Sequence, residues 1–457
     1  MAVTRRHFIG VAAAMAAAPR LALAQVTADG FTEVKAQKVT LGLLEDNTGK
    51  TEAWTFGAGQ EPVVIRAKQG QELKLRFINS LDQEIWLHFF GVRGPSELMT
   101  LNVPPGSDQA VDCIFTPPDA GTFWIGPVAN QSLLRDMGLY AMLIVDEAAL
   151  VPGLGDLAIV LDDWKLDDGG AIAGNFGDVE TMVGEGRLGN WFTVNNHYRP
   201  KLALKPGQFT RVRLLNAANV RTMGLLFKGY DPLVIARDGQ PVAAQPLDQK
   251  ALMLAPGQRA DLLVSPEEGD IRIALDLFED VVEIAYLIPE AQEKPPAIAD
   301  NFALPANPVT ALPVLTGARA VSLRIEGGIK GGLKSARFQG VERDLRALLE
   351  NGKGWALNGV AGPAAEPLFS ATLGEVILLE VDNRTAFSQP LHIHGHVWQV
   401  IDKDLSGRWQ DTAVIAAGKQ MTLAFIADNP GTWAIQSLVA ERADGGMIGA
   451  FTVAGAP

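Results

Sequence analysis

Gly70-Gln-Glu-Leu-Lys-Leu-Arg-Phe-Ile-Asn79 is the first of three segments in which a glycine is followed nine positions later by an asparagine. The other two are Gly207-Gln-Phe-Thr-Arg-Val-Arg-Leu-Leu-Asn216 and Gly374-Glu-Val-Ile-Leu-Leu-Glu-Val-Asp-Asn383. Apolar residues alternate through each segment, and a period of two places one face of a strand on a core. Each segment is therefore predicted to be a turn that leads into a half-buried strand.

A second, partial repeat follows each of these segments and opens a further strand. It is found at Pro105-Gly106, Pro256-Gly257 and Ala417-Gly418, and the first and third copies lead to Gly121-Thr-Phe-Trp124 and Gly431-Thr-Trp433. Three copies of one strand-and-turn module predict an all-β chain of three related sandwich domains.

The domain boundaries are predicted where the strand pattern lapses. We expect the first domain to span residues 25–150, the second 151–300 and the third 301–457. A connector rich in Pro and Ala, residues 289–313, is predicted to run extended over the surface between the last two domains. Helical signals are sparse, and the clearest short helix is expected at 342–350.

Length, charge and cysteine content restrict the class of protein. The chain has 457 residues, which suits three domains of ordinary size. Its net charge of -13 argues against nucleic acid as a partner, because phosphate binding needs a basic surface. A single cysteine, Cys113, excludes an intramolecular disulfide and is interpreted as a small core residue.

The N-terminus has the features of an export signal. Thr4-Arg5-Arg6-His7-Phe8-Ile9 is similar to a twin-arginine motif, and Ala22-Leu23-Ala24 is a small-residue cleavage pattern. Residues 1–24 are therefore predicted to be a twin-arginine signal peptide, with the periplasm as destination. A general secretory signal is the alternative. No apolar stretch is long enough to predict a membrane span.

Several motifs of the chain resemble those of multicopper oxidases. Trp355-Ala-Leu-Asn358-Gly359, Trp409-Gln-Asp411-Thr412 and Asp428-Asn-Pro-Gly-Thr-Trp433 are similar to family signatures around the metal sites. Leu161-Asp-Asp-Trp164 and Asp238-Gly-Gln-Pro241 fit the same pattern in the second domain. The resemblance covers the whole mature chain and implies three consecutive cupredoxin-like Greek-key β-sandwich domains. It also implies a type 1 copper site in the last domain and a trinuclear cluster between the first and the last.

The copper-ligand positions of the last motif, and the type 1 position of the third motif, carry other residues here. The frame of the last motif is present at Trp433, Gly446 and Met447. Its His-Cys-His positions hold Gln436, Ser437 and Leu438, and its later His position holds Arg442. The type 1 position of the third motif holds Gln389. Type 1 copper needs a thiolate, and serine cannot replace it at neutral pH. Met447 is therefore interpreted as a core residue.

The positions that imply a trinuclear cluster are only partly filled with histidine. In the first motif Phe90 replaces the second His, and in the second motif Gly126 and Val128 replace both. His88, His392 and His394 remain, and by the resemblance they are the residual type 2 and type 3 positions. His396 matches a family residue that is not normally a ligand, and a fifth histidine, His197, is expected to be exposed on a turn.

Two interpretations of the remaining histidines stay open. Two or three imidazoles could hold one Cu or Zn ion, with metal–nitrogen bonds of about 2.0 Å. Alternatively, they hydrogen-bond within the domain interface and no metal is present. The cofactor prediction is accordingly none or a single copper ion.

Two functions are compatible with this sequence. The first is a non-catalytic binding or scaffolding protein of the periplasm, similar in type to the copper-free multicopper-oxidase-like cell-division protein of enterobacteria, with cell-envelope or division proteins as partners. The second is a mononuclear, type 2-like copper-binding protein or oxidoreductase that uses His88, His392 and His394. We favour the non-catalytic interpretation. A single copper could cycle between oxidation states, but it could not reduce oxygen to water in four electrons, because that needs electrons stored at several coppers.

Overall fold

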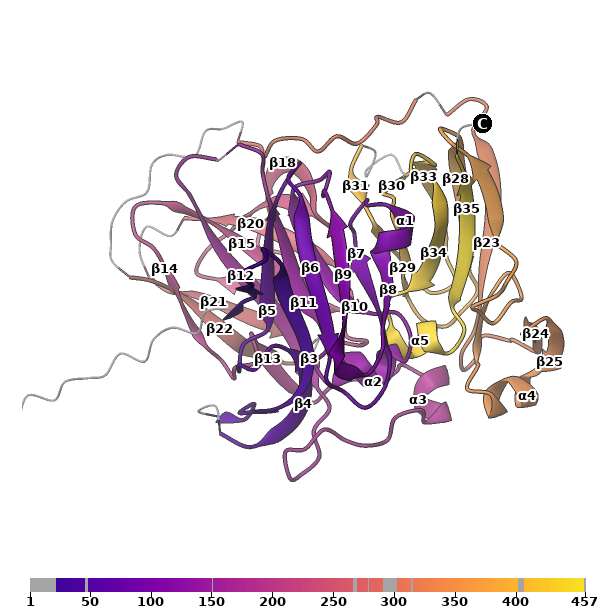
Figure 1. Cartoon of the computed structure of the whole chain (residues 1–457), viewed down its shortest axis with the longest axis horizontal. Coiled ribbons are helices and arrows are strands. Elements are labelled where there is room, and N and C mark those ends of the chain that lie inside the picture. Colours follow the sequence, from indigo (N-terminus) through magenta and orange to yellow (C-terminus); the bar gives the residue numbers. More distant parts are fainter. Residues whose placement is uncertain are drawn as a thin grey trace, which may run out of the picture.

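Strands dominate the architecture, as the alternating apolar segments predict. The computed structural model describes residues 22–45, 48–149, 151–265, 269–277, 279–290, 302–313, 315–401 and 407–455. Within these residues each of the three domains has a pair of facing sheets, and one hairpin is separate from them. The second, first and third domains lie side by side in the view of Figure 1. The prediction of an all-β chain of three sandwich domains is confirmed.

The first domain packs one sheet in the order β1-β5-β11-β10-β7-β8 against a second in the order β2-β3-β6-β9, with β4 paired to β3. Its strands are β1 Ala22–Leu23, β2 Gln25–Val26, β3 Thr32–Leu41, β4 Thr51–Phe56, β5 Val63–Lys68, β6 Leu73–Asn79, β7 Ile85–Phe90, β8 Thr100–Val103, β9 Gly106–Phe115, β10 Gly121–Pro127 and β11 Ala141–Asp146.

The second domain has sheets in the orders β13-β12-β15-β20-β17-β18 and β14-β22-β21-β16-β19. Its strands are β12 Leu154–Trp164, β13 Trp191–Val194, β14 Lys201–Leu204, β15 Phe209–Asn216, β16 Met223–Lys228, β17 Leu233–Arg237, β18 Gln240–Pro246, β19 Leu252–Leu254, β20 Arg259–Val264, β21 Ile271–Asp276 and β22 Val281–Pro289.

The third domain has sheets in the orders β26-β23-β28-β33-β30-β31 and β27-β35-β34-β29-β32, and β24 and β25 form the separate hairpin. Its strands are β23 Arg319–Gly327, β24 Ser335–Phe338, β25 Val341–Asp344, β26 Trp355–Leu357, β27 Phe369–Thr372, β28 Val376–Asn383, β29 Gln389–Ile393, β30 Trp398–Val400, β31 Trp409–Gln410, β32 Thr412–Ile415, β33 Gln420–Ile426, β34 Gly431–Ser437 and β35 Ile448–Ala454.

The helices within the described ranges are short and connect strands. They are α1 Ser96–Met99, α2 Gln131–Asp136, α3 Val179–Val183, α4 Leu345–Glu350 and α5 Ala440–Asp444. The helix predicted at 342–350 is only half correct, because its first part, Val341–Asp344, is strand β25 paired with β24. Asp344 then ends the strand by capping the helix, accepting a hydrogen bond from the N–H of Ala347 at 2.8 Å.

The three domains share one pairing scheme. The strand that ends in the repeated asparagine is parallel to an early strand of its own domain in the pairs β3–β6, β12–β15 and β23–β28. In the facing sheet a second parallel pair recurs as β5–β11, β14–β22 and β27–β35. The sequence repeat is therefore a repeat of topology.

The repeated asparagine has a structural role that explains its recurrence. Asn79, Asn216 and Asn383 are fully buried at the ends of β6, β15 and β28. Each side-chain oxygen accepts a hydrogen bond from the backbone N–H two residues later, and each Nδ2 donates to buried carbonyls of the following turn and a later strand or turn. One side chain thus satisfies backbone groups that would otherwise be buried without partners.

The expectation of half-buried strands holds for two of the three repeats. β6 and β28 alternate between buried and more exposed residues, whereas seven of the eight residues of β15 are buried. The prediction for β15 is wrong because its outer face packs against the first domain. There Arg213 donates to Thr122 at 3.1 Å, and Arg211 to Glu147 at 2.5 Å.

The other predictions about the chain are met in different ways. Of the predicted connector, Pro289 is still the last residue of β22, and residues 302–313 have neither helix nor strand. Leu304 is buried, and Asn307 bonds both the first and the second domain. Residues 1–21 of the predicted export signal lie outside the described residues. Cys113 is a buried free thiol, as predicted.

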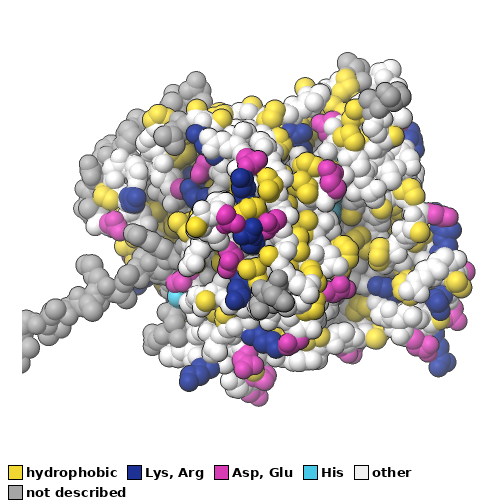
Figure 2. All heavy atoms as spheres, in the orientation of Figure 1, with side chains coloured by type: hydrophobic (Ala, Val, Ile, Leu, Met, Phe, Trp, Pro, Cys, Tyr) yellow, Lys and Arg dark blue, Asp and Glu magenta, His cyan; other side chains and the backbone are white. Residues whose placement is uncertain are grey.

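The surface and the helices give two further observations. Figure 2 shows acidic and basic side chains interspersed over the face that it views. In the part of the chain that the structure describes, none of the helices has the length and apolar character needed to cross a membrane.

We expect Asn383→Ala to lower the free energy of unfolding by about 2–4 kcal/mol, because several buried backbone groups lose their partner. Chemical denaturation followed by tryptophan fluorescence measures this. Asn102→Ala is the control, since that exposed side chain bonds only Glu84 and its loss should change stability by less than about 0.5 kcal/mol. Equal effects of the two substitutions would contradict the role given to Asn383.

Candidate metal centre

His88 enters the interface between the first and third domains from β7. The strand is almost completely buried, and the His88 side chain is 0 % exposed. Its neighbour in the sheet is Thr100 of β8, whose Oγ1 lies 2.9 Å from His88 Nδ1. This hydrogen bond fixes the ring and leaves Nε2 turned away from the strand pair, without a partner among the described residues.

His392 and His394 come from β29 and the turn that follows it. Nδ1 of His392 lies 3.1 Å from both Oδ1 of Asp411 and Oγ1 of Thr412. An ionised carboxylate can only accept, so Nδ1 carries the proton and Nε2 presents its lone pair. Carboxylate–imidazole contacts of this kind orient metal-binding histidines.

The structure brings the three predicted histidines together. His88, His392 and His394 each offer a ring nitrogen, and these atoms all lie within 4.8 Å of one another. The rings of His88 and His394 are stacked, with centroids 3.7 Å apart. All three Nε2 atoms are buried and lack a hydrogen-bond partner in the described part of the chain. Such a convergence of unsatisfied nitrogens fits one ion bound by imidazole.

Burial keeps the imidazoles of His88 and His394 neutral. Burial, and then the neighbouring ring of His392, lowers the pKa of His88 well below its ordinary value. The pKa of His394 is lowered in the same way, by burial and then by His88 and His392. Neutral imidazole is the form that binds metal.

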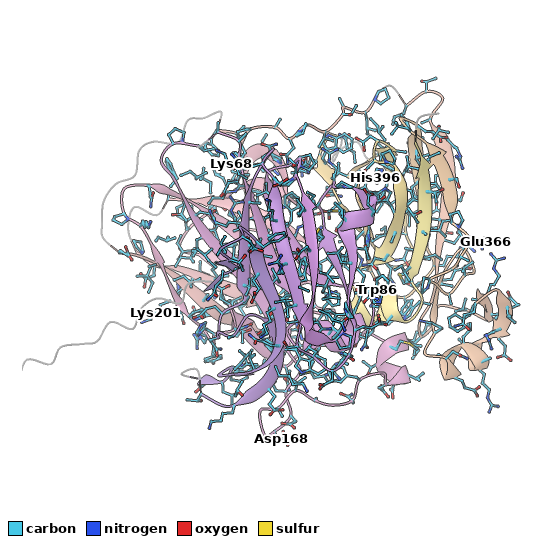
Figure 3. All side chains as sticks on the ribbon, in the orientation of Figure 1. Lys68, Trp86, Asp168, Lys201, Glu366 and His396 are labelled. Atoms are coloured by element: carbon cyan, nitrogen blue, oxygen red, sulfur yellow. The ribbon has the colours of Figure 1, made fainter. Side chains whose placement is uncertain are left out.

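His396 lies in the third domain (Figure 3) and is not a member of the three-histidine group. Its Nδ1 donates to the carbonyl of His394 at 3.1 Å, and its ring packs edge-on against Phe425 and Trp433. Burial lowers the pKa of His396 to about 4. His396 is therefore a buried core histidine. It is a natural control for His392 and His394, which belong to the same run of sequence.

An arginine from the second domain forms an ion pair with the carboxylate that contacts His392. Arg259 donates to Asp411 through two bonds, Nη1 to Oδ1 at 3.0 Å and Nη2 to Oδ2 at 2.5 Å. Although burial alone would raise the pKa of Asp411, Arg259 and then His392 hold it well below its usual range. The contact is tight on the side of the first domain: a Cβ on Gly91, whose φ is +86°, would lie 2.3 Å from Arg259 Nη2.

The positions predicted to have lost trinuclear ligands are filled by apolar groups. Phe90 stacks on Trp124 with centroids 3.9 Å apart, and both belong to one core cluster with Leu438, against which Val128 packs. Gly126 pairs with His88 across β10 and β7, and a Cβ there would lie 2.2 Å from the Trp124 ring. The space beside the three histidines is thus occupied by packed side chains.

Gln436, the remaining predicted lost position of this region, is a buried amide. It faces His392 across β29 and β34 and accepts a hydrogen bond from Gln131 at 3.4 Å. Its Nε2 has no partner within the described residues. It contributes a neutral polar group beside the centre.

The positions predicted to have lost type 1 ligands form a hydrogen-bonded chain of their own. Arg442 donates to Gln389 Oε1 at 2.9 Å, and Gln389 donates to Thr385 Oγ1 at 2.9 Å. Ser437 Oγ accepts from the N–H of Val439 at 3.1 Å. Burial lowers the pKa of Arg442 to about 10, which leaves it charged at neutral pH.

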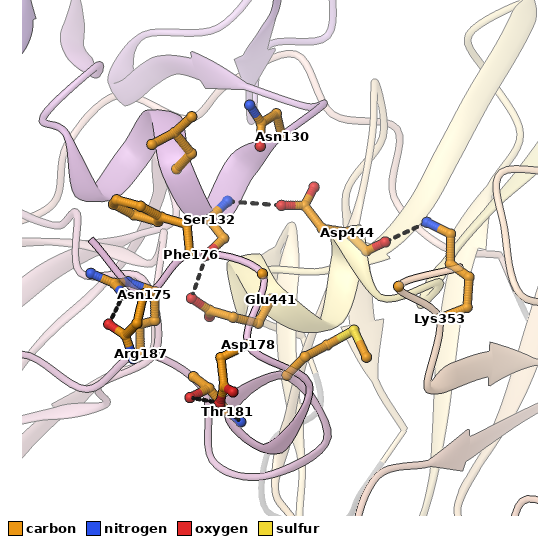
Figure 4. Close-up of a pocket in the computed structure, with 14 residues that line it drawn as sticks. Asn130, Ser132, Asn175, Phe176, Asp178, Thr181, Arg187, Lys353, Glu441 and Asp444 are labelled. Carbon is orange, nitrogen blue, oxygen red and sulfur yellow. Dashed lines mark hydrogen bonds between the residues drawn. The ribbon is translucent and has the colours of Figure 1, made fainter. Parts of the chain in front are cut away.

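A separate pocket of about 310 Å³ lies where short helices of all three domains meet (Figure 4). Asp444 of α5 accepts hydrogen bonds from the backbone N–H groups of Gln131 and Ser132 at the start of α2. Ser132 Oγ donates to Glu441 at 2.7 Å, and Lys353 Nζ to the carbonyl of Asp444 at 2.5 Å. These contacts join the domains, so we interpret the pocket as part of their junction.

Sequence reasoning was wrong about one histidine and missed one ion pair. His197 was expected to be exposed, but it is buried, with Nε2 3.3 Å from Glu61, because its turn packs on the first domain. Met447 is a core residue, as predicted. Asp411 belongs to the motif at 409–412, which by itself does not indicate an ion pair. Arg259 has no local sequence signal, because its partner is distant in the sequence.

Comparison with known proteins places this site in a family. Family models described as multicopper oxidase match residues 38–149, 162–272 and 340–456. Multicopper oxidase MmcO of Mycobacterium tuberculosis is 27% identical, covering 83% of this chain and 79% of that protein. Cell division protein FtsP of Yersinia pestis is 23% identical over the full length of both chains.

Solved structures agree with these matches. The crystal structure of a multicopper oxidase from Pseudomonas thermotolerans superposes with a TM-score of 0.78 at 28% identity, covering 92% of this chain and 98% of that one. A laccase-like multicopper oxidase, CueO, from Ochrobactrum superposes with a TM-score of 0.75 at 20% identity, covering 95% of this chain and all of that one.

We expect Gly91→Ala to destabilise the protein by about 3 kcal/mol more than Gly70→Ala, because it breaks the buried Arg259–Asp411 pair. Both glycines have positive φ, but a Cβ at Gly70 would meet open space. Gly70→Ala therefore reports backbone strain alone, about 1–2 kcal/mol. Thermal and chemical unfolding measure the difference, and equal losses in the two variants would contradict the tight contact.

Proposed function

This chain belongs to the multicopper oxidase family, and on that premise we propose that it is a member without oxidase activity. It acts as a binding or scaffolding protein of the cell envelope and holds neither a type 1 copper nor a complete trinuclear cluster. The observation that carries this proposal is the replacement of the copper ligands by side chains that are bonded and packed to one another.

The residues at the type 1 positions do not fit copper. Ser437 offers no thiolate, and the guanidinium of Arg442 would repel a metal cation placed beside it. Arg442 is engaged with Gln389 and lies over the rings of Trp355 and Phe387. Without this copper, electrons from a substrate have no site of entry, so we derive no oxidation step.

The residues at the type 3 positions do not fit a pair of coppers either. Phe90, Val128 and Leu438 supply no donor atoms, and they pack with Trp124 in one apolar cluster. Restoring a histidine at Gly126 would drive its Cβ into the Trp124 ring. Of the trinuclear positions, His88, His392 and His394 keep a nitrogen ligand.

Some of the named relatives favour a role in cell division. Cell division proteins FtsP of Yersinia pestis and Escherichia coli match this chain at 23% and 24% identity, beside relatives named multicopper oxidase. The export motif at Arg5-Arg6 is compatible with a periplasmic destination by the twin-arginine route. We infer that the partners are proteins of the envelope or of its division assembly.

We expect Ser437→Cys to bind no blue copper, because Gln389 and Arg442 still deny the ion its two imidazoles. The purified variant is loaded with copper and examined by visible absorption and electron paramagnetic resonance, alongside oxidase assays. Intense type 1 absorption in the single variant would refute this account of the site. The triple variant Gln389→His/Ser437→Cys/Arg442→His is the comparator that carries the full donor set.

A second candidate function is a single-metal protein. It is favoured by one observation: a ring nitrogen of each of the three histidines lies within 4.8 Å of the others, and their buried Nε2 atoms have no partner among the described residues. His88, His392 and His394 would hold the ion between the first and third domains. A bound copper would supply one-electron redox chemistry there, while Asp411 holds the proton of His392 on Nδ1 and fixes that ring.

We expect the mature protein, expressed with added copper and dialysed, to retain about one metal ion per chain. His88→Ala and His392→Ala should each lose it, since two imidazoles bind divalent metals only weakly. His396→Ala should keep it, because that equally buried ring lies outside the group. Elemental analysis measures the content, and an ion retained in His88→Ala and His392→Ala would exclude this centre.

The same variants separate the two candidate functions in cells. If the chain is a scaffold, His88→Ala and His392→Ala should complement a strain that lacks the chain as well as the wild-type protein does. A metal function predicts that both variants fail while His396→Ala succeeds.

A further inference from the structure

The donor set of the three-histidine group is electrically neutral. Imidazole binds metal as an uncharged ring, and in the described part of the chain no Cys, Asp or Glu side chain joins the group. Gln436, in register opposite His392, adds only a neutral amide. Metal sites that hold divalent ions tightly usually add thiolate or carboxylate charge, or an open position for water.

The charged residues nearest to the group add little compensation. Asp411 contacts His392 but is held in a bidentate ion pair by Arg259. Asp238 accepts a hydrogen bond from the N–H of Arg259 at 3.0 Å. Burial, and then Asp411, raises the pKa of Asp238 to about 7. At neutral pH the two carboxylates and the guanidinium together therefore carry between zero and one negative unit of charge, which balances at most one positive charge.

Apolar rings screen the group from water. The centroid of Phe90 lies 5.0, 5.5 and 5.8 Å from the rings of His88, His392 and His394, respectively. Phe90 in turn stacks on Trp124, and the three histidines are between 0% and 4% exposed. In such surroundings the desolvation penalty of an ion grows with the square of its charge, so a divalent ion is disfavoured far more than a monovalent one.

A monovalent ion that imidazole binds suits three nitrogens and surroundings that balance at most one positive charge. Cu(I) is monovalent and accepts three-coordinate geometry, whereas zinc on three imidazoles takes a water as its fourth ligand. We propose that this centre selects Cu(I) over divalent copper and zinc, with His88, His392 and His394 as its three ligands. This inference rests on the single-metal candidate proposed above and specifies the ion that it binds. That ion is monovalent copper, held without an exchangeable anionic ligand.

The test measures binding of each ion alone to the full mature chain. Cu(I) is titrated anaerobically with ascorbate against a chromogenic Cu(I) chelator, and Cu(II) and Zn(II) are measured by equilibrium dialysis. We expect one equivalent of Cu(I), silent in electron paramagnetic resonance, bound at least about tenfold more tightly than either divalent ion. His394→Ala should weaken Cu(I) binding at least about tenfold, and His396→Ala should leave it unchanged.

A second variant keeps the inference testable if His394→Ala fails to fold. Phe90→His places a further imidazole beside the group and should narrow the preference for Cu(I) over the divalent ions. Divalent copper or zinc bound as tightly as Cu(I) by the wild type would overturn the selectivity but leave the single-metal candidate standing. No binding of any of the three ions would overturn that candidate and the selectivity together.

Discussion

The buried ion pair between Arg259 and Asp411 is the contact on which the rest of the centre depends. Both side chains are completely inaccessible to solvent and come from different domains. Arg259 also donates to the carbonyl of Thr122 in the first domain at 3.1 Å, so one guanidinium touches all three domains. Removing one partner of such a pair leaves an uncompensated buried charge, at about 3–5 kcal/mol. Asp411 in turn orients His392, which makes the metal centre a consequence of domain packing.

The same principle extends along the interface between the first and second domains. Arg211 and Arg213 of the second domain are buried against the first; Arg211 donates to Asp261 of its own domain, and Arg213 donates to Thr122 of the first. Asp261 also accepts from Thr122 at 2.7 Å. The contacts that cross the interface, Arg211 to Glu147 and Arg213 to Thr122, hold the domains in register, since they form only in the correct arrangement.

The altered ligand positions form coherent replacements. At the type 1 positions Arg442, Gln389 and Thr385 bond to one another, and beside the histidines Phe90 and Leu438 pack with an existing tryptophan. In the polar chain the amide and hydroxyl groups pair with one another, and in the apolar cluster the rings pack together. Within the described residues some buried polar atoms still have no partner, among them Nε of Arg442, Nε1 of Trp124 and Nε2 of Gln436, and the ring nitrogens of His88, His392 and His394 are those that gather within 4.8 Å of one another.

The sequence by itself determined the fold class and the candidate ligands. Alternation of apolar residues and the recurring Asn79, Asn216 and Asn383 are local patterns, and local patterns specify strands and turns. What only the tertiary structure decided was the site: that His88 of the first domain meets His392 and His394 of the third, and that β15 is buried on both faces. The reason is physical, because these contacts join residues far apart in the chain. The periodicity of the sequence does not specify which faces of the three sandwich domains pack together.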